Sequence, residues 1–151
     1  MIEQLRAQIR ANYRPDFDFT IVDGVPFAVP SKPAAESRIA LISTAGLHLD
    51  TQPPFDRTTP EGDPSYRRIH LDDDLTRLRP WWDTDHHQPA SQDLNTAFPL
   101  SLLRDLCDLA PTHYTLSGSI PDPRPLLTQT APALAQELRA DAVDAALIAP
   151  S

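Results

Sequence analysis

The sequence has 151 residues, which is enough for one ordinary domain, and its single cysteine, Cys107, excludes an internal disulfide. Thirteen basic and 21 acidic residues give a net charge of -8, which argues against nucleic acid and anionic membrane surfaces because both require a basic face. No signal peptide and no apolar run near the roughly 18 residues of a membrane span is visible, so we expect a cytoplasmic protein.

The first part of the chain predicts a helix, an arm and a strand. Apolar residues at helical spacing predict a short amphipathic helix over 2–13, which stops before Pro15. Alternating aromatic and apolar residues over 17–29 predict a small hairpin or an extended arm. The unbroken apolar run after Arg38, which ends at Ile42, predicts a core strand covered on both faces.

The segment 50–97 is the least regular part of the sequence. It contains six prolines, the acidic run 72–74 and a polar run over 83–95, so we interpret it as a functional loop or as disordered. Tyr66, Ile69 and Leu71 alternate with polar residues, which predicts a short strand near 66–71.

Regular structure is expected again from Pro99 onward. An apolar stripe predicts a helix from Pro99 to about Ala110, and 112–116 predicts a second strand. Apolar residues from 127 to 138 predict a one-sided helix that either starts near Thr130 or kinks there, because Pro132 lies inside it. The run 143–149 predicts a third apolar strand of the buried type.

This order of strands and helices predicts one α/β domain with a three-layer, Rossmann-like or flavodoxin-like parallel sheet. We expect 1–36 to form an N-terminal helix and extended arm, and 37–151 to form the core with its irregular loop. The sheet is expected to be incomplete at the C-terminus, because only Pro150 and Ser151 follow the last strand. A catalytic loop normally begins at that position.

Several segments together carry a family resemblance: 37–48 (SRIALISTAGLH), 53–56 (PPFD), 62–67 (GDPSYR), 93–100 (DLNTAFPL), 102–106 (LLRDL), 110–114 (APTHY) and 143–150 (VDAALIAP). In this order the sequence resembles the selenoprotein B family of the glycine, sarcosine and betaine reductases, together with the D-proline reductase selenoprotein subunit. The resemblance covers roughly residues 26–151. It departs from the family pattern in a shorter connection before 110–114 and in an imperfect match around 83–87.

The resemblance implies reductive cleavage of a carbon–nitrogen bond in a small amino-acid-like substrate. In this family a selenocysteine or cysteine, in a U-x-x-C or C-x-x-C motif, follows the strand that resembles 143–150. The implied partners are a thioredoxin-like reductant or other reductase subunits, and no cofactor is expected in this chain. We therefore hypothesise that the next codon is a UGA read as a stop, that the chain is the N-terminal part of a selenoprotein, and that this part alone is inactive.

The candidate binding residues lie on the rim beyond the strand ends. His48 is of a type that can orient a substrate carboxylate or donate a proton, or it can simply bind loop backbone. Arg67 can hold a carboxylate through two parallel hydrogen bonds, or it can close the loop with Asp63. Tyr66 lies between them in sequence, and His113 either faces the same rim or is buried.

Other polar residues favour simpler interpretations. Asp83, Asp85, His86 and His87 have metal-ligand types but no known ligand spacing, so a solvated loop is favoured over a metal site. Cys107 on its leucine-rich stripe is interpreted as a small core residue.

The alternative function is a non-catalytic α/β domain that binds a small anion or a partner subunit. It predicts a stable, cooperative folder, whereas a reductase fragment predicts exposed apolar surface beside 143–148.

Overall fold

The computed structural model describes residues 1–19, 24, 28–80, 93–118 and 120–150. The predicted solvated loop with Asp83, Asp85, His86 and His87 lies outside these ranges, as does much of the predicted arm over 17–29. Helix α1 (Ile2–Asn12) confirms the first predicted helix, and it has no buried residue. The core begins after a 3-10 turn at Ala34–Glu36.

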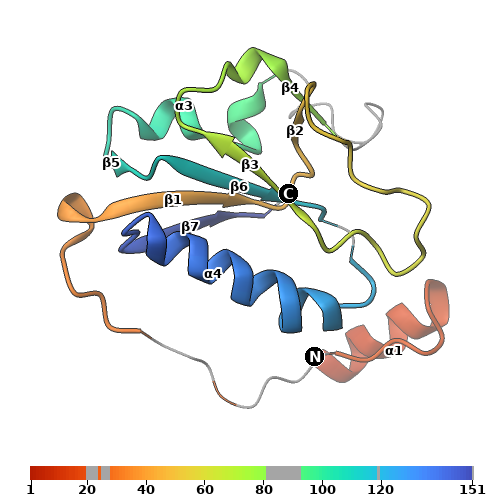
Figure 1. Ribbon diagram of the computed structural model, residues 1–151. Helices are drawn as coiled ribbons and strands as arrows, with labels where there is room; N and C mark the ends of the chain where they lie inside the picture. Colours follow the sequence, from red (N-terminus) through yellow and green to blue (C-terminus); the bar gives the residue numbers. More distant parts are fainter. Residues whose placement is uncertain (20–23, 25–27, 81–92, 119, 151) are drawn as a thin grey trace.

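The core is an α/β sheet of five strands, most of them parallel (Figure 1). Strand β1 (Arg38–Ser43) lies in its middle, with β6 (Thr112–Leu116) on one side and β7 (Ala145–Ala149) on the other. The short β5 (Asp108–Leu109) pairs with the start of β1. Strand β3 (Tyr66–His70) pairs antiparallel with β6 and forms the far edge. These findings confirm the predicted fold class and all four predicted strands.

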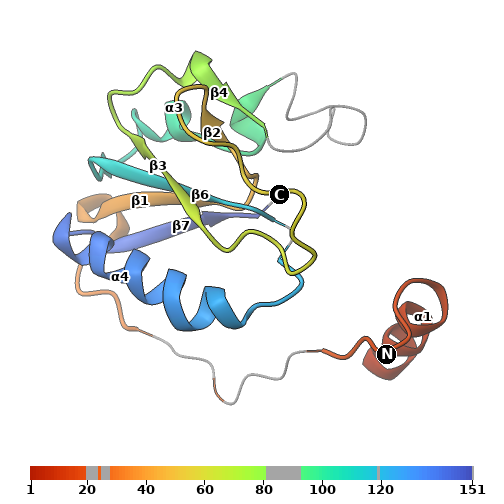
Figure 2. The ribbon, with the colours of Figure 1, turned by 45° about the vertical axis from the view of Figure 1, so that its right-hand side comes forward.

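Helical segments cover both faces of the sheet. Helix α4 (Ala131–Ala140) lies against one face, and α3 (Leu100–Leu103) lies on the opposite side together with the small β2–β4 ribbon (Figures 1 and 2). The ribbon pairs β2 (His48–Leu49) with β4 (Leu78–Arg79), and the sequence did not predict it. Two 3-10 turns, Leu75–Arg77 and Leu94–Thr96, flank these elements.

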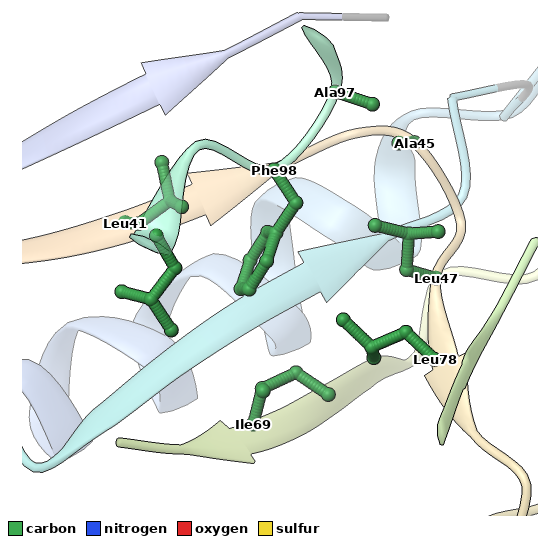
Figure 3. Packing of buried hydrophobic residues seen from close by; sticks show 8 residues of the cluster. Leu41, Ala45, Leu47, Ile69, Leu78, Ala97 and Phe98 are labelled. Carbon is green, nitrogen blue, oxygen red and sulfur yellow. The ribbon is translucent and has the colours of Figure 1, made fainter. Parts of the chain in front are cut away.

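Two apolar clusters hold the layers together. On the α3 face, Leu41, Leu47, Ile69, Phe98 and their neighbours are almost fully buried (Figure 3). On the α4 face, the cluster contains Ile42, Tyr114, Leu116 and Leu134. Strand β1 contributes to both clusters because successive side chains of a strand point to opposite faces. The unbroken apolar run after Arg38 therefore produced the doubly covered strand that was predicted.

The predicted helix from Pro99 to about Ala110 is wrong for most of its length. Only Leu100–Leu103 is helical, and Asp108–Leu109 instead pairs with β1. Pro111 disfavours a helical conformation in the residue before it, and the chain must extend here to enter β6 beside β1. Leu106, predicted on the apolar stripe, is 74% exposed.

The α-helix before the last strand begins next to Thr130, as the position of Pro132 predicted. A π-helical turn at Leu126–Thr130 leads directly into α4, so the change of helical geometry falls just before Pro132, whose missing N–H cannot bond to the preceding turn. Strand β7 then follows at the position predicted. Its residues are apolar as in a buried strand, but four of the five are exposed because β7 is an edge strand among the described residues. Exposed apolar surface beside 143–148 is what the reductase-fragment hypothesis predicts.

Candidate functional site

The order of the parallel strands defines a reversal point in the sheet. The chain runs from β1 to its neighbour β6 through the segment that contains α3, and then crosses over β1 to β7 through α4 (Figure 1). The spatial order β6–β1–β7 is the 2-1-3 order of flavodoxin-like sheets. In such sheets, ligands bind beyond the carboxyl ends of the strands where the winding direction reverses. The carboxyl ends of β1 and β7 therefore mark the candidate site.

Backbone and side-chain hydrogen bonds fix this edge. The Thr44 N–H donates to the Ala149 carbonyl at 3.1 Å, so the ends of β1 and β7 are joined directly. The fully buried Ser43 donates through Oγ to the Ala97 carbonyl at 2.7 Å and accepts from the Ala45 N–H at 3.1 Å. Ser117, at the end of β6, is buried, and its Oγ has no hydrogen-bond partner among the described residues.

His48 lies just past this edge, on β2. Its side chain is largely buried, and Nδ1 has no partner within the described part of the chain. Burial lowers the pKa of His48, and the positive charges of Arg67 and Arg79 lower it further, against a smaller opposing effect from the Gly46 backbone. A neutral imidazole with an unpaired nitrogen can accept or donate a hydrogen bond to a ligand.

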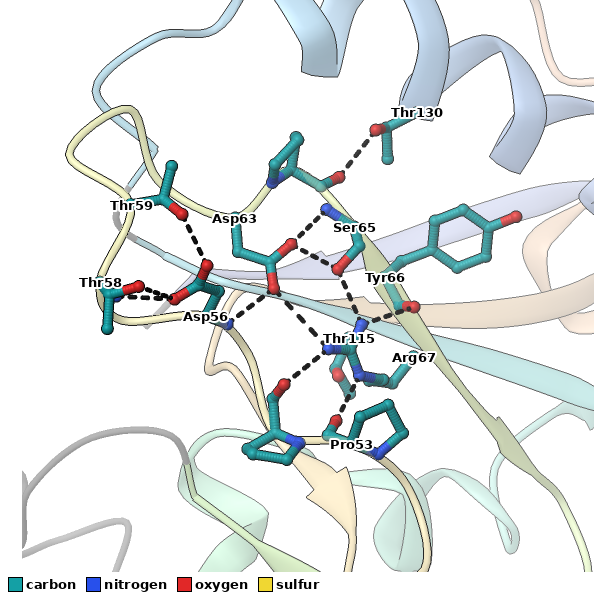
Figure 4. Close-up of polar contacts among 12 residues, drawn as sticks. Pro53, Asp56, Thr58, Thr59, Asp63, Ser65, Tyr66, Arg67, Thr115 and Thr130 are labelled. Carbon is teal, nitrogen blue, oxygen red and sulfur yellow. Dashed lines mark hydrogen bonds and ion pairs between the residues drawn. The ribbon is translucent and has the colours of Figure 1, made fainter.

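Asp63 and Arg67 organise the loop that leads into β3 (Figure 4). Asp63 accepts from the backbone N–H groups of Asp56 at 2.8 Å and Ser65 at 2.9 Å. Burial acts to raise the pKa of Asp63, but the hydrogen bonds from Ser65 and Asp56 and the charge of Arg67 together hold it below its usual value. The carboxylate is therefore ionised at neutral pH.

The Arg67 guanidinium binds other groups of this chain. It donates through Nε to the Pro53 carbonyl at 2.8 Å and through Nη2 to the Pro54 carbonyl at 3.0 Å, and it lies 3.7 Å from Asp63. It also lies over the Phe55 ring, 4.1 Å from the centroid. These contacts favour the loop-closing interpretation over direct capture of a carboxylate, although binding of substrate by Asp63 and Arg67 stays a prediction.

Tyr66 lies on the other face of the sheet. Its hydroxyl donates to Glu137 of α4, to which Arg68 also donates, through Nε at 2.7 Å. Its ring packs edge-on against Tyr114 at 5.8 Å. Burial raises the pKa of Tyr66, and the hydrogen bond to Glu137 adds to this effect. The structure thus separates Tyr66 from His48 and Arg67 and uses it to connect β3 to α4.

His113 is fully buried within the sheet. The Leu41 N–H of β1 donates to its Nδ1 at 3.0 Å, so this side chain substitutes for a backbone acceptor between the two strands. Its Nε2 has no partner in the described ranges. Burial, together with the charge of Arg104, lowers the pKa of His113 to about 4. His113 therefore has a structural contact in place, and a contact with substrate stays a prediction.

The structure brings His48, Asp63 and Arg67 to one region and leaves Tyr66 and His113 in the sheet. Ser43 and Ser117 were not predicted as site residues. Their positions, as polar residues at the ends of two apolar strands, could have indicated them. In the part of the chain that the structure describes, no three His, Cys, Asp or Glu residues are grouped to hold a metal ion. No helix in the described ranges is long and apolar enough to cross a membrane.

The fold and this edge define a doubly wound α/β protein with its candidate site at the reversal point of the sheet. The chain is similar to D-proline reductase subunit gamma of Acetoanaerobium sticklandii, with 26% identity over 149 residues and coverage of 87% of this chain. It is a distant homologue of that reductase subunit, which confirms the family resemblance predicted from the sequence. The chain spans 60% of the length of this relative. No family model and no solved structure matches the chain.

Proposed function

We propose that this chain is the N-terminal part of a reductase subunit that cleaves a carbon–nitrogen bond in an amino-acid-like substrate. The relative's name supplies the reaction class, since it is a subunit of a D-proline reductase. The observation that carries the proposal for this chain is the position of the β7 carboxyl end, which the Thr44–Ala149 hydrogen bond holds at the reversal point of the sheet. The residue after Ser151 would enter the ligand-binding edge.

The proposed chemistry needs a selenol or thiol at the carboxyl end of β7, whereas Cys107, the one cysteine of the sequence, lies just before β5, which pairs with the start of β1. A selenolate or thiolate after Ser151 attacks the carbon, the carbon–nitrogen bond breaks, and the nitrogen leaves as an amine after taking up a proton. A second thiol then attacks the sulfur or selenium, which releases the reduced carbon with a proton and forms a disulfide or selenenyl sulfide. A thioredoxin-like reductant or another reductase subunit would return the two electrons.

His48 is the proposed substrate contact in this site, and Asp63 with Arg67 holds the loop that forms its wall. The support for His48 is its buried, unpaired Nδ1 and its lowered pKa, which keep a neutral imidazole available near pH 7. A neutral imidazole can accept or donate a hydrogen bond, so His48 is proposed to orient the amine or carboxylate of the substrate beside the strand ends.

The first test compares 1–151 with the chain extended through its downstream reading frame, in a dithiol-driven assay with D-proline and related amino acids. We expect turnover only from the extended chain with any partner subunit it requires, and loss of turnover when serine replaces the first selenocysteine or cysteine after Ser151. A dithiol-dependent rate from 1–151 alone, or no open frame after codon 151, would contradict the proposal.

The second test is His48→Asn in the extended chain. We expect kcat/KM to fall by about 10-fold, because the variant loses one substrate hydrogen bond worth about 1 kcal/mol. His70→Asn is the matched control, because His70 is exposed and lies opposite Thr112 at the start of β6, at the other edge of the sheet from the candidate site. Equal activity of the His48 variant and the control would remove His48 from the site while leaving the reaction class standing.

A further inference from the structure

Strand β7 has a free outer edge and apolar hollows on both sides. It pairs with β1 along its whole length, and no strand in the described residues pairs with its outer side. Leu147 is 43% exposed and Ile148 is 62% exposed, on opposite faces of the sheet. An unpaired apolar edge of this kind is normally covered in a native protein, because it would otherwise recruit other chains.

The two hollows differ in what forms them. On the α3 face, a hollow of about 510 Å³ is bounded by Leu103, Leu106, Cys107 and Leu147 among others. On the α4 face, a hollow of about 350 Å³ lies between Ile148 and the apolar side of α4, where Leu134 and Leu138 contribute. A helix packed beside α4 over the outer part of the sheet would fill the second hollow.

We propose that the segment after Ser151 covers this edge: it returns as a helix beside α4 and then adds a strand parallel to β7. This inference rests on the proposed function, which requires the chain to continue. Crossovers between parallel strands are right-handed, so a further step in the direction from β6 to β7 must place its helix on the α4 face again. The occupant is therefore expected over Ile148, Leu134 and Leu138.

The length of the relative agrees with this occupant. The chain spans 60% of that protein, so a comparable intact chain has ample length for a helix and a strand after Ser151. The same return path explains how a nucleophile after Ser151 would be held at the reversal point, since the strand before it and the helix after it would both be packed.

The test introduces a negative charge at the free edge of β7 and compares two proteins. One is 1–151, and the other is the extended chain with cysteine in place of any selenocysteine. In 1–151, Ile148→Glu and the control Leu127→Glu should lower the melting temperature equally and slightly, because the two side chains are 62% and 61% exposed. In the extended chain, Ile148→Glu should lower it by about 10 °C or more, while Leu127→Glu keeps its small effect.

Amide hydrogen exchange of the extended chain gives a second readout that does not depend on the stability of 1–151. The β7 amides that point away from β1 should exchange at least about 100-fold more slowly than amides of the exposed loop over 56–62. Fast exchange there together with a tolerated Ile148→Glu would overturn the inference and leave the reductase proposal intact, since turnover is measured separately.

Two other outcomes also overturn it. Protection of β7 in 1–151 that grows with protein concentration would assign the edge to a second copy of the chain. Absence of a reading frame after codon 151 would remove the proposed segment and, with it, the proposed function.

Discussion

Strands β1 and β7 have similar apolar sequences but differ strongly in burial. Ile39-Ala-Leu-Ile-Ser43 lies in register beside Ala145-Ala-Leu-Ile-Ala149, so Leu41 neighbours Leu147 and Ile42 neighbours Ile148. Leu41 is 0% and Ile42 8% exposed, whereas their neighbours on β7 are 43% and 62% exposed. The difference lies in what surrounds each strand, because among the described residues β1 has a partner strand on both sides and β7 has one. An apolar run thus encodes a strand, and its place in the sheet decides its burial.

The largest effect is expected from matched truncations of the two leucines. Leu41→Ala should lower the free energy of unfolding by about 3–5 kcal/mol, because it leaves a cavity in the core beside Phe98. Leu147→Ala in 1–151 should cost less than about 1 kcal/mol, since its side chain is already half in water. Urea unfolding at neutral pH measures both, and equal costs would contradict the contrast between the strands.

A pH dependence is expected from the side chain that connects β1 to β6. His113 has a pKa of about 4 in the folded protein and 6.5 when unfolded, so the unfolded chain binds more protons between these values. Its stabilising effect is complete above pH 6.5 and is lost as the pH falls toward 4, by about 3 kcal/mol.

The control for this prediction is His113→Asn, whose Oδ1 can still accept from the Leu41 N–H. Urea unfolding between pH 7 and pH 4 should give a shallower loss of stability for this variant, with the remaining slope shared by His48 and the carboxylates. An unchanged slope would show that His113 does not titrate as its burial implies.

The smallest effect on stability is expected at the carboxyl ends of the two strands, where β1 has Ser43 and β7 has Ala149 at the same register. Ser43→Ala gives β1 the residue that β7 has at the same register, and it should cost about 1–2 kcal/mol because the buried Ala97 carbonyl and Ala45 N–H lose their partner. The reverse change, Ala149→Ser, should stay within about 0.5 kcal/mol because β7 is an edge strand. Thermal unfolding compares the pair, and a larger cost for Ala149→Ser would contradict the account of this edge.

Strands and most of the fold class were predictable because their signals are local. The apolar run of β1, the alternation over β3 and the apolar run of β7 each produced a strand. The helix predicted from Pro99 was mostly wrong. Its sequence has a leucine-rich helical pattern, but Asp108–Leu109 pairs with β1 instead, and this tertiary contact requires an extended backbone. The exposure of β7 could not be deduced from its own apolar run, because burial depends on the neighbouring elements of the fold.

The candidate site was predictable in position more than in detail. His48 lies on β2, which follows the carboxyl end of β1. Arg67 lies in β3 opposite Thr115 near the end of β6, with Asp63 in the preceding loop, and the binding roles of these residues stay predictions. Two contacts could not be predicted from the sequence. The contact of Tyr66 with Glu137 joins residues that are 71 positions apart, and the hydrogen bond from Leu41 to His113 depends on the relative position of β1 and β6.

The most direct measurement of the central claim is the intact mass of the protein isolated from its native cells. The account predicts a mass clearly above the 16.7 kDa of the 151 residues, with a peptide that joins Pro150 and Ser151 to a segment containing selenocysteine or cysteine. A native mass of 16.7 kDa would contradict it, because the free edge of β7 and the reversal point beside it would then have no nucleophile and no covering segment.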